Sequence, residues 1–428
     1  MDLNMFDPAV MSNPYPIYAS LRKQAPIVWS SALGAWMVTA YDEAVAVLQD
    51  HWAFSNQDRG CSCGAIREAT LSYDLGNSAA QVLTSPTMLN TDPPDHTILR
   101  SLASKAFTPR AVTLLELRMR EITEQLLPAL TDGTAFDVVD VLAYPLPVIM
   151  IAEMLGIPPE DRDSFKRWSD DIISVNETSK PDDVARVRVS NQDLRRYLSG
   201  IIEERRRIPR EDLISRLLEA MVGNERFGQE ALVDMCILLL VSGNETTTNL
   251  ISSALLALAR APAQRQKLLG DPTLLPTAVE EFLRFDGPVQ IVPRIAARDV
   301  VMGDTAIAEG SMVLVMLAAA DRDPARFENP DALDVTRTDN PHIAFGRGIH
   351  YCLGGPLARL EGRIALAAFL RRFPRFELAS PSSPLEYGSS FVLRGLRRLD
   401  IAGYHEQRRI PARREAVLPS VFGEPCGW

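Results

Sequence analysis

The sequence is poor in several features that mark particular classes of protein. Five cysteines, an odd number, among 428 residues do not suit the disulfide framework of a small secreted domain. Cys61 and Cys63 are spaced like a pair of metal ligands, but no second Cys/His pair accompanies them at zinc-ligand spacing, so no zinc site is expected there. The longest apolar run, residues 231–241, contains Asp234 and falls well short of the roughly 20 residues that span a bilayer. Insertion into a membrane is therefore not expected.

An excess of positive charge is also missing. The net charge is −10, whereas binding to nucleic acid needs clustered cations, so nucleic acid is not expected as a partner. Residues 1–26 hold no basic segment followed by an apolar one, so no signal peptide is expected and the predicted location is cytoplasmic. Only 5 of the 45 basic residues are lysine. This bias is typical of a GC-rich coding genome and indicates a bacterial source.

Apolar residues recur at helical spacing through most of the chain. The segments with this pattern are 111–130, 144–155, 193–207, 211–221, 230–260 and 274–285. Short stretches of strand-like composition lie at 27–38, 295–301 and 311–317. The sequence thus predicts a mainly α protein with small peripheral β-sheets. Because no linker or repeat divides it, we expect one domain over residues 1–402, followed by a loosely attached tail over residues 403–428.

Cys352 lies in an unusual local setting. A lone cysteine is more often a small buried hydrophobic residue than a reactive one. Here, however, Gly346, Gly348 and Gly354 surround it and allow the backbone to approach a large, flat group. An apolar helical pattern begins directly after it, and the N-terminus of a helix stabilises a thiolate. The residues by themselves leave open whether such a thiolate is a nucleophile or a metal ligand.

The stretch 345–354, Phe-Gly-Arg-Gly-Ile-His-Tyr-Cys-Leu-Gly, resembles the heme-binding loop of the cytochrome P450 monooxygenases. This resemblance implies the cytochrome P450 fold and a heme b whose iron has Cys352 as its axial thiolate ligand, with Phe345 and Gly346 in the heme-binding loop. Electron donation from the thiolate favours cleavage of the O–O bond. The likeness extends over residues 7–401. The members that the chain resembles are the bacterial, soluble ones.

Two further segments carry cations that the resemblance assigns to the heme propionates. His96 and Arg100 stand at i, i+4 on one face of an expected helix, a spacing that by itself more often marks a solvated face. In the family, the residues equivalent to His96 and Arg100 bind the propionates, together with the residues equivalent to Arg294 and His350. Four such groups would compensate two buried carboxylates, each of which otherwise costs several kcal/mol to bury.

Glu281 and Arg284 stand at i, i+3 on an expected helix, and such a pair is usually a surface ion pair of little energetic value. In the cytochrome P450 family this Glu-x-x-Arg pair is buried and joined by a further arginine, to which Arg337 corresponds. The resemblance therefore implies a structural role for these three residues.

Polar residues interrupt the expected long helix 230–260 near its centre. Gly in a helix costs about 1 kcal/mol relative to Ala, and an unpaired buried polar group about 1–3 kcal/mol. A polar contact between helices would explain them structurally. By the resemblance, Glu245 and Thr246 are instead the acid–alcohol pair that delivers protons for O2 activation. Ser242 stands where alanine is commoner in the family, and Asn244 where histidine is frequent.

The resemblance also implies a substrate pocket and partner proteins. The expected lining residues are Leu83, Met88, Leu239, Ser242, Val289, Val292 and Phe391. Because they are mostly apolar, we expect a hydrophobic small-molecule substrate, hydroxylated or epoxidised with O2. Electrons are expected from a separate ferredoxin and an NAD(P)H-dependent ferredoxin reductase that dock on a basic face, and the protein is expected to be a monomer. The residues expected on that face are Arg347, Arg359, Arg363, Arg371 and Arg372.

Two other classes of function are considered. A heme-fold recruitment module without catalysis, or atypical P450 chemistry, would keep the fold, but the intact Glu245–Thr246 pair argues against a module. A hydrolase using Cys352 as nucleophile and His350 as base is disfavoured. The two residues are only two positions apart on a glycine-rich loop, which is poor geometry for His350 to act as the base.

Overall fold

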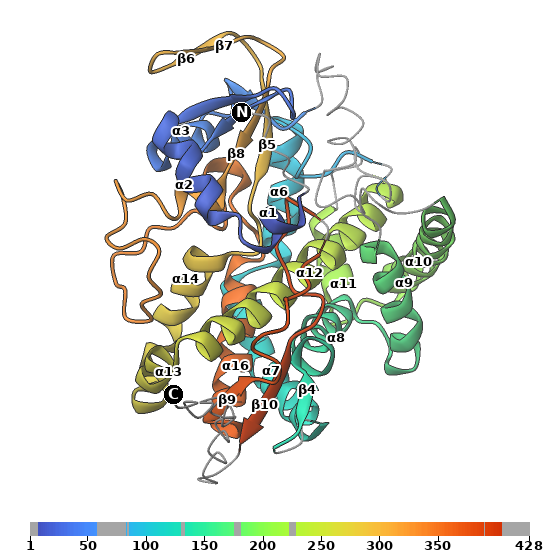
Figure 1. Ribbon diagram of the computed structural model, residues 1–428. Coiled ribbons are helices and arrows are strands. Elements are labelled where there is room, and N and C mark those ends of the chain that lie inside the picture. Colours follow the sequence, from blue (N-terminus) through green and yellow to red (C-terminus); the bar gives the residue numbers. More distant parts are fainter. Residues whose placement is uncertain are drawn as a thin grey trace, which may run out of the picture.

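The computed structural model describes residues 7–57, 83, 85–129, 133–174, 181–221, 228–388 and 390–404. Within these residues the chain is mainly helical with small β-sheets, as predicted (Figure 1). No helix in the described part of the chain is both long and apolar enough to cross a membrane. Cys61, Cys63 and the tail from residue 405 onward lie outside the described residues.

The longest helix, α12 (Gln229–Arg260), runs through the middle of the helical part of the molecule (Figure 1). Most of its side chains are buried, including the run from Leu232 to Val241, so it is a core helix rather than a surface one. Among the helices that pack against it are α8 (Pro145–Leu155), α9 (Arg162–Ser174), α10 (Pro181–Arg207), α14 (Leu275–Asp286) and α16 (Gly355–Arg372). A large apolar core lies between α12, α14 and α16.

The remaining helices surround this core. The α-helices are α1 (Pro8–Ser12), α2 (Tyr15–Gln24), α3 (Tyr41–Gln49), α6 (Asp95–Ala106), α7 (Pro109–Leu126), α11 (Leu213–Met221), α13 (Pro262–Gly270) and α15 (Leu317–Ala320). Single helical turns occur at η1 (Leu127–Ala129), η2 (Val139–Ala143), η3 (Pro159–Asp161), η4 (Pro272–Leu274) and η5 (Gly348–His350). The start of α7 shows how the local sequence determines where a helix begins. Thr108 caps the helix by accepting a hydrogen bond from the Ala111 N–H, and Pro109 occupies the first turn.

The main sheet has five short strands in the order β1 (Ile27–Ser30), β2 (Ala35–Val38), β8 (Met312–Val315), β5 (Val292–Ala296) and β3 (Phe54–Ser55). Only β2 and β8 are parallel. In the pairing of β5 with β8, Arg294 lies opposite Val313. The segment expected as one strand over 27–38 is thus a hairpin of two strands.

A second sheet pairs β4 (Ala135–Asp137) and β9 (Arg375–Leu378) with the central β10 (Asp400–Tyr404), and β6 (Val300–Met302) with β7 (Thr305–Ile307) forms a separate hairpin. Strand β10 extends to Tyr404, two residues past the expected domain end at 402. Helix α10 begins at Pro181, twelve residues before the expected start at 193. Its first three turns contain only Ala185 and scattered valines as apolar residues, so the hydrophobic pattern there is weak.

Candidate active site

Cys352 is held in a tight loop between η5 and α16. The Cys352 N–H donates to the carbonyl of Phe345 at 2.9 Å, and Gly346 and Gly348 have φ angles of 71° and 70°. A Cβ on Gly348 would lie 2.5 Å from the carbonyl oxygen of Leu48 on α3, so only glycine fits this position. The loop geometry therefore requires the glycines that the sequence places there.

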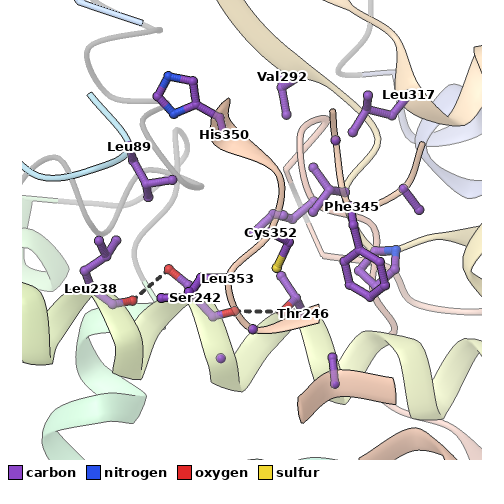
Figure 2. A pocket seen from close by; sticks show the side chains of 18 of the residues that line it. Leu89, Leu238, Ser242, Thr246, Val292, Leu317, Phe345, His350, Cys352 and Leu353 are labelled. Carbon is purple, nitrogen blue, oxygen red and sulfur yellow. Dashed lines mark hydrogen bonds between the residues drawn. The ribbon is translucent and has the colours of Figure 1, made fainter. Parts of the chain in front are cut away.

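The sulfur of Cys352 sits at the N-terminus of α16, as the sequence predicts. Burial raises the pKa of its thiol, while hydrogen bonds from the N–H groups of Gly354 and Gly355 and the charge of Arg100 lower it. Figure 2 shows the Cys352 side chain directed toward α12, with Phe345 beside it on the same loop. Two N–H groups and a nearby cation are a suitable setting for a thiolate that also ligates a metal ion.

A cavity of about 350 Å³ lies between the Cys352 loop, α12 and residues 288–295. Its lining is mostly apolar, and Figure 2 shows Leu89, Val292 and Leu317 among the side chains around it. Of the expected pocket residues, those that line this cavity are Met88, Leu239, Ser242, Val289 and Val292. Leu83 packs against a neighbouring apolar cluster instead. Phe391 packs among core residues such as Val10, while the next two residues along the chain, Val392 and Leu393, line the cavity.

Four basic side chains from three segments gather at one side of the cavity. His96 on α6 and His350 on η5 have ring centroids 4.3 Å apart, and Arg100 and Arg294 line the cavity itself. Burial lowers the pKa of Arg294 to about 10. Burial, followed by the charges of Arg294 and His96, lowers the pKa of His350 to about 3. Asp92 offsets part of the positive charge at His96 and Arg294, but four basic groups still outweigh it among the described residues.

The buried Nε2 atom of His96 has no hydrogen-bond partner among the described residues. Unpaired buried polar atoms are rare in proteins and indicate a group still to be bound. An anionic ligand with two carboxylates would satisfy both the charges and this nitrogen. The residues present therefore fit a heme, with its propionates at this cluster and its iron at Cys352.

Helix α12 presents the hydroxyl groups of Ser242, Thr246 and Thr247 to the cavity. The Ser242 Oγ donates to the Leu238 carbonyl and the Thr246 Oγ1 donates to the Ser242 carbonyl, each at 2.7 Å (Figure 2). Glu245 also lines the cavity, and Gly243 has open space where a Cβ would lie. Asn244 faces the other way, because its buried side chain donates to the Ser169 hydroxyl of α9 at 3.3 Å. Asn244 therefore forms a contact between two helices, whereas Ser242, Glu245 and Thr246 border the cavity.

Glu281, Arg284 and Arg337 form a buried cluster between α14 and the irregular segment 321–340. Arg284 and Glu281 are both fully buried on α14 and form a bidentate pair with N···O distances of 2.7 and 2.8 Å. The Arg337 Nε lies 3.1 Å from the same carboxylate, and the backbone N–H of Asp334 donates to it at 2.8 Å. The cluster ties α14 to the irregular segment that leads toward the Cys352 loop.

The predicted site lacks a charged residue of the cavity wall. Glu361 on α16 is only 2% exposed and lines the cavity. In the sequence it stands on the apolar stripe formed by Leu357, Leu360 and Ile364. A charged residue on such a stripe is the signal that could have identified it.

Comparisons with known proteins agree with this geometry. The family model described as Cytochrome P450 matches residues 78–394. The "Putative cytochrome P450 YjiB" of Bacillus subtilis is 42% identical over 390 residues, which cover 90% of this chain and 93% of that protein. "Vitamin D(3) 25-hydroxylase" of Pseudonocardia autotrophica is 39% identical over 403 residues, which cover 93% of this chain and 96% of that protein.

A solved structure of CYP109E1 from Bacillus megaterium in complex with testosterone superposes with a TM-score of 0.80 at 36% identity. The match covers 91% of this chain and 99% of that one. Relatives of this identity over nearly the whole length share the fold and the family. The fold, the cysteine loop and the extent of these matches together show that the chain belongs to the cytochrome P450 monooxygenases.

Proposed function

We propose that this protein inserts one atom of O2 into a C–H or C=C bond of a hydrophobic small molecule and reduces the other atom to water. The observation that carries the proposal is the placement of Cys352 at one wall of an apolar cavity, with Glu245 and Thr246 on α12 at another wall. A heme bound there would supply the O2 activation and oxygen insertion.

The chain's own residues would hold that heme at both its centre and its edge. Cys352 would ligate the iron, while His96, Arg100, Arg294 and His350 would bind the two propionates. Heme b is the form that fits best, since this arrangement needs only an axial thiolate and paired carboxylates and no covalent attachment to the porphyrin.

Glu245 and Thr246 are proposed to move protons. The reaction consumes two protons per turnover, and a hydroxyl that lines the cavity can hold an ordered water in place. Thr246 Oγ1 would orient the water and Glu245 would pass protons from outside. The hydrogen bond from Thr246 to the Ser242 carbonyl is a local one that a helical threonine can exchange for a bond to water.

The substrate is proposed to be a medium-sized, neutral, hydrophobic metabolite. Both arginines that line the cavity, Arg100 and Arg294, belong to the propionate cluster, so the lining offers no further cation for a substrate carboxylate among the described residues. A relative named as a vitamin D hydroxylase and a neighbour solved with testosterone are consistent with a steroid-like compound. Terpenoid and macrolide compounds fit the same chemistry, whereas a free fatty acid would find no further cation for its carboxylate among the described lining residues.

Electrons are proposed to come from a ferredoxin and its NAD(P)H-dependent reductase, docking near the Cys352 loop. The expected basic face carries less free charge than the sequence suggests. Arg359 binds Glu280 with an N···O distance of 2.6 Å, and Arg363 lies 3.5 Å from Glu116. Arg371 pairs with Glu124 as well. Docking would therefore depend on shape and on exchange of these partners as much as on net charge.

The test is the absorption spectrum and turnover of the purified, heme-loaded protein. A thiolate-ligated heme gives the family's red-shifted Soret band in its reduced CO complex, which a cysteine hydrolase would lack. Product formation with a ferredoxin and reductase, from a compound that also displaces the iron-bound water, would establish the enzyme. A normal CO spectrum without turnover of any hydrophobic compound would favour the recruitment module instead.

A further inference from the structure

Arg394 directly follows two residues that form part of the cavity wall. Val392 and Leu393 both line the cavity, and the backbone N–H of Arg394 donates to the carbonyl of Pro288 at 2.8 Å. Pro288 lines the cavity as well, and Leu393 pairs with Val289, another lining residue, across an isolated β-bridge. These four lining residues therefore form one continuous surface, which we call the paired wall.

The side chain of Arg394 is almost fully buried and connects the paired wall to two distant parts of the chain. It is 7% exposed, and its two terminal nitrogens donate to the carbonyls of Met11 at 2.5 Å and Ser12 at 3.0 Å. Its Nε donates to the carboxylate of Asp286, the last residue of α14, at 2.8 Å. One guanidinium group thus joins α1, the end of α14 and the paired wall.

The shape of the guanidinium group matters for this connection. Met11 and Ser12 end α1, and carbonyl groups at the end of a helix have no partner within the helix. The guanidinium carbon lies 4.0 Å from the ring centroid of Tyr387 and 5.8 Å from that of Tyr15. Its N–H groups form a planar fork, which reaches two neighbouring carbonyls and a carboxylate at once. Lysine, with one flexible ammonium group, has no such fork.

The N-terminal helices also support the paired wall with apolar side chains. Val10, Tyr18 and Leu21 belong to the same apolar cluster as Val392 and Leu393. Figure 1 shows α1, in blue, beside the red C-terminal segment that carries the last two residues. Among the described residues, none of α1 or α2 lines the cavity itself. These helices therefore lie behind the wall, on the side away from a ligand.

A buried arginine can serve the fold alone, so the position of Arg394 in the chain matters. Residues 391–394 lie in a bend that belongs to no helix and no named strand, so regular secondary structure does not fix Val392 and Leu393. Because Arg394 follows Leu393 directly, a shift of its anchored side chain is passed to that neighbour through the backbone. The anchor of Arg394 thus determines how far these two side chains reach into the cavity.

We propose that Arg394 is a positioning residue for substrate selectivity. By fixing the paired wall to α1 and α14, it sets where Val392 and Leu393 meet the ligand. This inference deepens the proposed function and rests on it, because the ligand is the hydrophobic substrate proposed above. The N-terminal segment then contributes to selectivity without touching the substrate.

The experiment measures how imidazole and 1-alkylimidazoles of increasing chain length bind to the heme-loaded enzyme, followed by the shift of the Soret band. Imidazole binds the iron and contacts little of the wall, whereas each buried methylene of an alkyl chain tightens binding by roughly fourfold. In wild type, affinity should therefore rise with chain length from methyl to octyl. In Arg394→Lys, imidazole should bind as in wild type, but the Kd of 1-octylimidazole should rise roughly tenfold, the equivalent of one to two buried methylenes.

The matched control is Arg265→Lys. Arg265 is also 7% exposed, donates to the carbonyl of Phe376 at 2.5 Å and lies 4.4 Å from the centroid of that ring, but it does not line or border the cavity. Lysine at position 394 keeps the positive charge beside Asp286, so both variants should fold and bind heme. Both should unfold at somewhat lower urea concentration, and only Arg394→Lys should weaken the dependence of affinity on chain length.

The outcomes distinguish the role of Arg394 from the proposed function. An unchanged dependence on chain length in Arg394→Lys, or an equal loss in both lysine variants, would overturn the role of Arg394 alone. A wild type without the thiolate CO spectrum would overturn the proposed function, and a wild type that binds all chain lengths equally would contradict the hydrophobic cavity on which both proposals rest.

A second variant keeps the proposal testable if Arg394→Lys fails to bind heme. Tyr387→Leu removes the ring that stacks on the guanidinium group and leaves every hydrogen bond of Arg394 in place. The Kd of 1-octylimidazole should then rise roughly threefold, as expected for the loss of a cation–π contact, with imidazole unaffected. An unchanged Kd for 1-octylimidazole in Tyr387→Leu would contradict the proposal.

Discussion

Replacing Arg284 with alanine tests whether the buried cluster between α14 and the irregular segment 321–340 supports the fold. Arg284 is fully buried, forms two bonds of 2.7 and 2.8 Å with Glu281, and donates to the carbonyls of Asp321, Pro330 and Ala332 at 2.7–3.1 Å. Removing it leaves the Glu281 carboxylate buried without its main partner, which typically costs 3–5 kcal/mol. Arg337 and the Asp334 N–H still contact that carboxylate. We therefore expect about 3 kcal/mol, near the lower end.

The assay is urea unfolding followed by circular dichroism, with heme retention measured by absorbance on the same samples. Arg326→Ala is the matched control, because Arg326 pairs with Asp339 across 3.0 Å at the surface and should cost no more than about 1 kcal/mol. We expect Arg284→Ala to unfold at clearly lower urea concentration and to lose heme. A midpoint equal to that of Arg326→Ala, with full heme content, would show that the buried pair does not hold the loop region together.

Four further predictions follow from the same structure. Cys352→His should give a heme protein without the thiolate CO spectrum and without product, because electron donation from sulfur is lost. Thr246→Ala should fold and bind substrate but convert less of the consumed NAD(P)H into product and more into peroxide, as measured by parallel assays. Gly348→Ala should lower heme retention on dilution, because a Cβ would meet the Leu48 carbonyl at 2.5 Å at a φ of 70°, a strain of about 1–3 kcal/mol. Glu361 has a pKa of about 8 in the folded state and about 4.5 in the unfolded state, so the free energy of unfolding of the wild type should fall as the pH rises between these values. Urea titrations of Glu361→Gln should show a weaker dependence of this free energy on pH.

Local patterns in the sequence predict much of the site. The glycines around Cys352 predict a loop that only small residues allow, and the structure has positive φ angles at two of them. The long apolar pattern over 230–260 predicts a core helix, and α12 covers the same range within one residue. These features depend on neighbours in the chain, so the sequence contains the information directly.

Features that depend on contacts between distant segments were harder to foresee. The five arginines of the expected docking face appear free in the sequence, but Glu280 on α14 neutralises Arg359 from a position 79 residues away. Phe391 was expected at the cavity, but in this irregular segment no periodicity determines which side chain turns inward. Glu361 interrupts an apolar stripe in the sequence, but its burial at the cavity results from the packing of α16 on α12.

The clamp on the cysteine loop has a consequence for how the protein is made. Gly348 fits against the Leu48 carbonyl of α3, and Tyr41 on the same helix donates its hydroxyl proton to the Pro341 carbonyl, 300 residues further along the chain. Bringing together segments so far apart costs loop-closure entropy before the contact contributes any stability, so contacts of this kind slow folding. During synthesis, α3 leaves the ribosome long before the cysteine loop exists and cannot complete this contact. Heme capture would then be one of the last events of folding, and a chain shortened at the N-terminus through α3 would lose the support of its iron ligand while keeping the ligand itself.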